Sequence, residues 1–209
     1  MVLSFSGHNK FILPQPIATD DVFTINLEFV IEDILTVDDT NGYIEIKEKI
    51  IRTWFDPQLQ YMNLKEDPSM NRLTVAEQAK LWMPWTVYDN VVNGAAIKRA
   101  ELPDIVSLIP LRNFSYTLGD RTLYQNTRIF EGSSTMIRLQ REFSAKFICD
   151  YNMVWYPFAT QICSLKFFHR EELVHLKPTS VIYLGPQNLD KHYVESVRCA
   201  KKLSITDLV

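Results

Sequence analysis

Alternating apolar and polar residues predict that this chain is built from β-strands. In residues 22–37 (VFTINLEFVIEDILTV), every second side chain from Phe23 to Ile31 is apolar and would lie on one face of a strand. Residues 43–54 (YIEIKEKIIRTW) alternate in the same way. The sequence Asp-Asp-Thr-Asn-Gly at 38–42, between the two segments, is typical of a tight turn. We therefore expect these two strands to form a β-hairpin.

Short candidate strands continue along the rest of the chain. Residues 86–135 alternate weakly and are interrupted by turn residues. More strands are predicted within residues 134–147, 164–168, 171–190 and 192–205. Many short strands separated by turns are typical of a sandwich or barrel. Since residues 1–20 could also form a short helix, we expect an all-β, immunoglobulin-like β-sandwich of about ten strands with a short N-terminal helix.

The composition is that of a globular protein and excludes several functional classes. The chain has 209 residues, of which 46% are hydrophobic and 22% charged, and this length suits a single domain spanning residues 1–209. The net charge of −3 and the absence of a basic block make nucleic acid an improbable partner. No apolar run approaches the length that a membrane-spanning helix needs, so we expect no membrane span within this chain.

Enzymatic and metal-dependent chemistry is poorly supported by the sequence. The four histidines, His8, His169, His175 and His192, fall on different segments. The chain has no HExxH or GxSxG motif and no glycine run that could bind phosphate. We therefore expect no enzymatic activity, no cofactor and no metal site.

Two of the three cysteines, Cys149 and Cys163, enclose an unusual segment of thirteen residues. The segment is rich in aromatic residues and contains no glycine, so its apolar side chains must pack against another surface. The cysteine spacing, together with the ending Tyr156-Pro157-Phe158-x-x-Gln161-x-Cys163, resembles the signature loop of the Cys-loop receptors. These receptors are pentameric ligand-gated ion channels. The family usually has Asp after the Pro-aromatic pair, where this chain has Ala159.

Two other segments support this resemblance. Residues 54–59 (WFDPQL) match the Trp-x-Asp-x-x-Leu pattern of the family. Residues 82–84 (WMP) resemble its Trp-x-Pro-Asp motif, except that Trp85 stands where Asp is usual. Just before this motif, Thr74 and Glu77 have the spacing of a capping box and predict one helical turn.

The resemblance implies a disulfide between Cys149 and Cys163 and a location at the extracellular face of the plasma membrane. A disulfide that closes about fifteen residues stabilises a fold by about 3 kcal/mol, and it needs an oxidising compartment. The sequon at Asn113 would suit glycosylation in that compartment. For Cys199 we favour a buried apolar role, with a free thiol or a bond outside this chain left open.

The resemblance also implies a small-molecule site between subunits, which we located by counting from the matched tryptophans and cysteines. The predicted positions are Tyr88 and Asp89 for the first loop, His169 and Arg170 for the second, Tyr193 for the third, and Lys49, Ile51, Arg138 and Gln140 on the neighbouring subunit. Only 46 residues follow Cys163. The hairpin of the third loop is therefore either abbreviated around residues 202–209 or completed outside this chain.

The predicted site lacks the aromatic box with which the family attracts quaternary amines through cation–π contacts. Asp89, Arg170 and Lys49 occupy positions where aromatic rings would be expected. We therefore expect an anionic, zwitterionic or amphiphilic ligand in place of an acetylcholine-like one. Two alternatives stay open. The counted positions could be one or two residues out, or the charges could pair with each other, Asp89 with Lys49 or Arg170.

In the family, the disulfide loop and the first hairpin turn face the pore domain, which is absent from this chain. The corresponding coupling positions are Asp38, Asp39, Tyr156, Pro157 and Phe158. The expected assembly is a pentamer of identical or different subunits that passes ligand binding to the pore. A secreted binding protein of the same fold without a channel is the main alternative, and an unrelated secreted sandwich is the second.

Overall fold

The computed structural model describes residues 2–4, 9–15, 22–92, 98–99, 104–111, 129–149, 151, 163–169, 173–184, 194–199 and 203–208. Strands predominate in these residues. The helical elements among them are each one turn long: η1 (Pro68–Met70), α1 (Val75–Gln78) and η3 (Gly132–Ser134). The predicted all-β class is therefore confirmed. Of residues 1–20, the structure describes a strand at 2–4 and no helix in 9–15, and the predicted N-terminal helix otherwise falls outside the described residues.

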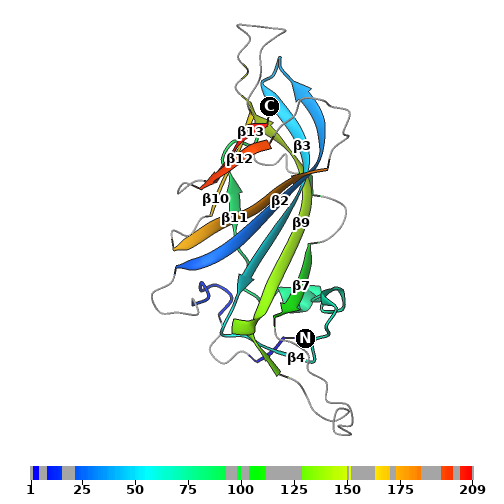
Figure 1. Cartoon of the computed structure of the whole chain (residues 1–209), viewed down its shortest axis with the longest axis vertical. Helices are drawn as coiled ribbons and strands as arrows, with labels where there is room; N and C mark the ends of the chain where they lie inside the picture. Colours follow the sequence, from blue (N-terminus) through cyan, green and yellow to red (C-terminus); the bar gives the residue numbers. More distant parts are fainter. Residues whose placement is uncertain are drawn as a thin grey trace. The chain divides into compact units, whose positions relative to one another are not determined.

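Within the described residues, the strands form three sheets. The described strands are β1 (Val2–Ser4), β2 (Phe23–Asp38), β3 (Tyr43–Phe55), β4 (Gln60–Met62), β5 (Thr86–Tyr88), β6 (Lys98–Arg99), β7 (Ile105–Pro110), β8 (Ile129–Glu131), β9 (Thr135–Ile148), β10 (Cys163–His169), β11 (Val174–Tyr183), β12 (Val194–Cys199) and β13 (Leu203–Leu208). The largest sheet has the order β11-β2-β3-β9-β6, with β7 also paired to β9 (Figure 1). The others have the orders β12-β13-β10-β5 and β1-β4-β8.

The chain forms two compact units. The first comprises Met1–Ile25, Arg52–Met83 and Ile105–Leu139, and the second comprises Asn26–Ile51, Pro84–Asp104 and Gln140–Val209. The long strands β2, β3 and β9 contribute residues to both. The single domain expected from the sequence stays a prediction. No helix in the described ranges is both long and apolar enough to cross a membrane.

The predicted alternation determines which side chains enter the core. In β2 the side chains from Phe23 to Ile31 that we expected to share a face are all buried. In β3 the alternation holds from Ile44 to Ile50 and then breaks, because residues 50–52 are buried one after another. Glu48 shares the buried face and is only 1% exposed. The faces of β2 and β3 that enter the core were therefore predicted correctly from the apolar pattern.

Two of the sequence motifs meet in the first unit. The Trp54 ring packs edge-on against Trp82, with 6.2 Å between ring centroids, and Trp82 packs against Phe23 in the same way at 5.4 Å. Edge-to-face aromatic pairs contribute more to stability than their buried area alone. The tryptophans of the WFDPQL and WMP segments thus have a packing role, since both are buried.

A tight turn follows Trp54 and leaves no room for a side chain at Gly132. The Leu59 backbone N–H donates to the Asp56 carbonyl (3.1 Å), and the Gly132 N–H donates to the Leu59 carbonyl (2.8 Å). A Cβ atom on Gly132 would lie 1.8 Å from the Asp56 carbonyl oxygen. Burial, together with the nearby Asp56 carboxylate, raises the pKa of Tyr61 in this region.

The predicted capping box is present and begins α1. The Thr74 hydroxyl accepts a hydrogen bond from the Glu77 backbone N–H (3.3 Å), and the Glu77 carboxylate accepts one from the Thr74 backbone N–H (2.9 Å). The helix ends after a single turn, as the sequence indicated.

In the second unit, two sheets pack through aromatic side chains. Tyr88 of β5 contacts Phe143 and Phe147 of β9, with centroid distances of 5.4 and 5.8 Å. Strand β5 pairs with β10, which pairs with β13, so that β10, β12 and β13 lie side by side (Figure 1). The Tyr88 contacts therefore place β5, an edge strand of the four-stranded sheet, against β9.

We predict that Gly132→Ala destabilises the protein by about 2 kcal/mol or more, because the added methyl group forces the backbone of the turn apart. Gly42→Ala is the matched comparison. Its cost is about 1 kcal/mol, because Gly42 has a φ of +69° but its added Cβ would meet Cys149 O at an ordinary 3.4 Å. Thermal unfolding at one fixed protein concentration measures both. Equal melting temperatures for the wild type and Gly132→Ala would refute this steric account of the turn.

Candidate functional site

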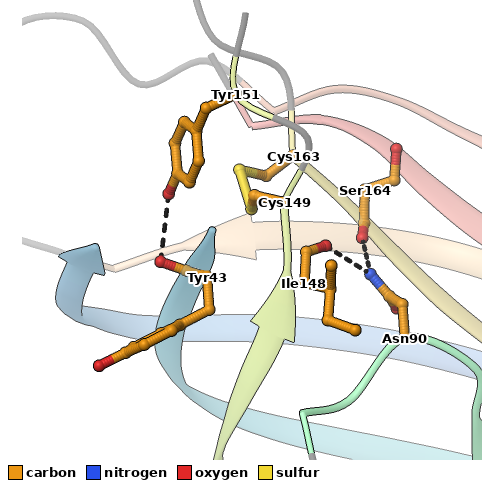
Figure 2. The surroundings of a disulfide bond; sticks show 7 residues. All are labelled: Tyr43, Asn90, Ile148, Cys149, Tyr151, Cys163 and Ser164. Carbon is orange, nitrogen blue, oxygen red and sulfur yellow. Dashed lines mark hydrogen bonds between the residues drawn. A yellow bond between two sulfur atoms is a disulfide. The ribbon is translucent and has the colours of Figure 1, made fainter. Parts of the chain in front are cut away.

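Cys149 and Cys163 form the disulfide that the resemblance implied. Their Cα atoms are 5.1 Å apart, and each residue is only 5% exposed. Cys149 directly follows β9 and Cys163 begins β10, so the bond joins the ends of two strands that belong to different sheets (Figure 2).

The hairpin turn between β2 and β3 is hydrogen-bonded to the first end of the disulfide loop. The Cys149 backbone N–H donates to the Gly42 carbonyl (2.9 Å), and the Tyr151 hydroxyl donates to the Tyr43 carbonyl (3.2 Å; Figure 2). Burial, and then the Asp39 and Asp38 carboxylates, raise the pKa of Tyr151. The predicted coupling positions Asp38 and Asp39 therefore lie near the loop.

The turn itself is ordered by Asp38. Its carboxylate accepts hydrogen bonds from the Asn41 backbone N–H and from the Asn41 side chain, each at 2.8 Å. The bond from the Asn41 side chain, followed by the backbone bond, lowers the pKa of Asp38. The other predicted coupling positions, Tyr156, Pro157 and Phe158, lie outside the described residues, as does Asn113.

The first and second predicted binding loops lie on neighbouring strands of one sheet. Tyr88 of β5 is opposite Phe167 of β10, and His169 is opposite Thr86. The Asp89 backbone N–H donates to the Lys166 carbonyl (2.8 Å), and the Asp89 side chain is exposed. The Tyr88 ring instead packs against Phe143 and Phe147 of β9.

The last two strands of the described part of the chain form a hairpin. Strand β13 pairs with β12, from Val194 opposite Leu208 to Cys199 opposite Leu203, and it also pairs with β10. A hairpin of β12 and β13 is compatible with the abbreviated alternative, and the third binding loop itself stays a prediction. Tyr193 and Arg170 lie outside the described residues.

Among the positions predicted for the neighbouring subunit's side of the site, Lys49 contacts two acidic side chains. Its ammonium group lies 2.9 Å from a Glu32 carboxylate oxygen and 3.1 Å from a Glu142 oxygen. The Gln140 amide also donates to Glu142 (3.2 Å). We call Glu32, Lys49, Gln140 and Glu142 the Lys49 cluster. It brings the predicted positions Lys49 and Gln140 together through a carboxylate that the sequence analysis missed.

The other two neighbour-side positions lie outside this cluster. Ile51 is 5% exposed and belongs to the core. Arg138 is half-buried on β9 and belongs to the first unit. Glu32 and Glu142 could have been found from the sequence, because both fall on the polar face of a predicted alternating strand. Their pairing with Lys49 could not, since it depends on the register of three strands.

The charges of the Lys49 cluster stabilise one another. Lys47, at 2.8 Å, and then Lys49 lower the pKa of Glu32 against the opposing effect of burial. The hydrogen bond to Glu32, and to a lesser extent that to Glu142, raises the pKa of Lys49. Lys49 is therefore ion-paired, and its described partners are Glu32 and Glu142. Within the described ranges, no group of three or more His, Cys, Asp or Glu side chains is arranged to hold a metal ion.

We predict that Glu32→Gln lowers stability by about 1 kcal/mol at pH 7, because two partly exposed ion pairs are lost. A carboxylate with a lowered pKa stabilises the fold fully above its unfolded pKa of about 4.3. That contribution disappears as the pH falls through the lower folded value. The difference between the wild type and Glu32→Gln should therefore shrink towards zero as the pH falls through the lowered pKa of Glu32.

Melting temperatures between pH 7 and pH 3 measure this effect. Glu28→Gln is the control, because Glu28 lies on the same strand and has no ion pair within the described part of the chain. A difference between the wild type and Glu32→Gln that is independent of pH would show that the ion pairs do not stabilise the fold.

Comparison with known proteins places the chain in a family. No curated protein matches it. The family model described as "Neurotransmitter-gated ion-channel ligand binding domain" matches residues 3–180, which is most of the chain. This match includes the disulfide, both tryptophan motifs and the Lys49 cluster. The chain therefore belongs to the family of neurotransmitter-gated ion-channel ligand-binding domains.

Proposed function

We propose that this chain is the extracellular ligand-binding domain of a pentameric ligand-gated ion channel and that it binds a small zwitterionic molecule between subunits. The family is a class of binding domains and not of enzymes, its ligand-binding domains are extracellular, and it implies pentamers with a ligand at the subunit interface. The five subunits would be identical or different, and the pore domain would be supplied by sequence outside this chain.

The Lys49 cluster is the observation that supports this ligand class. Lys49 and Glu142 are each partly exposed, at 23% and 22% of their side chains, so both charges can be reached from solvent. A zwitterion can present its carboxylate to Lys49 and its ammonium group to Glu142. Charge-assisted hydrogen bonds of this kind are about twice as strong as neutral ones.

The same cluster argues against an acetylcholine-like ligand. A quaternary ammonium group cannot donate a hydrogen bond, and its usual partners are aromatic faces. The described neighbour-side positions supply charged and amide groups, with Gln140 beside Glu142. Because Lys49 is paired with Glu32 and Glu142, the cluster presents both positive and negative charge. This balance of charge favours a zwitterion over a simple anion.

The opposite wall of the proposed site comes from the first three loops. Asp89 would meet the ligand directly from the end of β5, with Tyr88 supporting it from the core. His169, Arg170 and Tyr193 are the further proposed contacts on this side, and Arg138 is the further proposed contact on the other. Binding would be passed to the pore through the disulfide loop, at Tyr156, Pro157 and Phe158, and through the hairpin turn, at Asp38 and Asp39. No covalent bond is made or broken.

We predict that a zwitterionic amino acid such as glycine or alanine binds the assembled protein and that Lys49→Gln weakens this binding at least tenfold, which is about 1.4 kcal/mol. Isothermal titration calorimetry with these amino acids and with choline measures the affinities. The control is Lys47→Gln, which removes the same charge from the same strand at a side chain that is 48% exposed and contacts only Glu32 of the cluster. Its affinity should change less than threefold.

Choline binding more tightly than every amino acid tested would contradict the proposed ligand class. Equal affinities for Lys49→Gln and the wild type would place the ligand elsewhere. A protein that binds the ligand as a monomer would contradict a site between subunits.

A further inference from the structure

The side chain of Asn90 contacts both ends of the disulfide-closed loop. Its Nδ2 group donates to the Ile148 carbonyl (3.1 Å) and to the Ser164 carbonyl (2.6 Å; Figure 2). Ile148 immediately precedes Cys149, and Ser164 immediately follows Cys163. One carboxamide therefore holds the two backbone segments from which the loop departs.

Every hydrogen-bonding group of the Asn90 side chain is used. A carboxamide has two N–H donors and one oxygen acceptor. The oxygen accepts a hydrogen bond from the Lys166 backbone N–H (2.9 Å). The Asn90 backbone carbonyl also accepts one from the Ile148 N–H (2.8 Å). This set of contacts requires both donors and an acceptor within one short side chain.

Asn90 also continues the segment that carries the first predicted binding loop. Tyr88 and Asp89 precede it directly, and the Asp89 N–H donates to Lys166, whose own N–H donates to Asn90. A displacement of residues 88 and 89 would therefore be transmitted to the ends of the loop through a short chain of hydrogen bonds. The disulfide joins the end of β9 to the start of β10, and Asn90 attaches the segment after β5 to that junction.

We propose that Asn90 is a positioning residue that fixes both ends of the disulfide loop relative to the candidate ligand positions Tyr88 and Asp89. Its significance for channel coupling rests on the proposed function. Its positioning role does not need a ligand and is tested without one. Asn90 thereby adds to the coupling surface a residue that lies on neither the hairpin turn nor the disulfide loop.

The test is the rate at which tris(2-carboxyethyl)phosphine reduces the Cys149–Cys163 disulfide in the folded protein at pH 7. Both cysteines are 5% exposed, so the reductant reaches the bond only when the ends of the loop open. Alkylation of the released thiols and mass spectrometry give the rate. We expect Asn90→Ala to be reduced at least tenfold faster than the wild type, because three side-chain hydrogen bonds that oppose opening are lost.

Asn71→Ala is the matched control. The Asn71 side chain makes the same kind of contacts in the first unit, where it accepts from the Lys65 N–H (2.8 Å) and donates to the Lys65 and Leu108 carbonyls (2.8 and 3.2 Å). Its loss should lower the melting temperature as Asn90→Ala does, but change the reduction rate less than twofold. Equal acceleration by both variants would show a general loss of stability and overturn the proposal.

Asn90→Asp separates hydrogen bonding from space-filling. Aspartate has nearly the same shape, but at pH 7 its oxygen would face the carbonyl oxygens of Ile148 and Ser164. We expect reduction at least as fast as in Asn90→Ala, whereas a rate near that of the wild type would overturn the proposal. If Asn90→Ala does not fold, Asn90→Ser replaces it in the comparison. Failure of the calorimetric test with amino acids would leave these rates unaffected, so the two proposals fail separately.

Discussion

A disulfide between Cys149 and Cys163 joins the end of β9 to the start of β10, and the neighbouring segments of the second unit are attached at this junction. The hairpin turn is attached to this junction by the hydrogen bond from the Cys149 backbone N–H to the carbonyl of Gly42, a residue with a positive φ. The segment after β5 reaches it through Asn90. Changes at the hairpin and at β5 therefore converge on the same few backbone groups.

Much of the local structure could be predicted from the sequence, because it follows from side-chain periodicity and from short-range hydrogen bonds. The apolar positions from Phe23 to Ile31 are buried as alternation requires, and Thr74 and Glu77 form the capping box that their spacing indicated. The exception in β3 is also local. Three successive buried residues at 50–52 break the alternation, and this is why Ile51 lies in the core although it was expected near a ligand.

The long-range polar contacts could not be predicted, because they depend on how separate strands are aligned. Asn90 is 58 residues from Ile148 and 74 from Ser164, and nothing in the local sequence marks it as different from a turn asparagine. The structure also changes the interpretation of Lys49. As an isolated residue it suggested a positive site, whereas between Glu32 and Glu142 it becomes part of a charge-balanced surface. The ligand class therefore follows from the pairing of charges and not from their count.

The central claim is that the ligand lies between subunits, so the most direct measurement is the molar mass of the protein by light scattering with a saturating zwitterionic amino acid. A mass of about 122 kDa, which is five chains of 24.4 kDa, is the predicted result. A mass of 24.4 kDa for protein that has bound the amino acid would contradict a site shared between subunits.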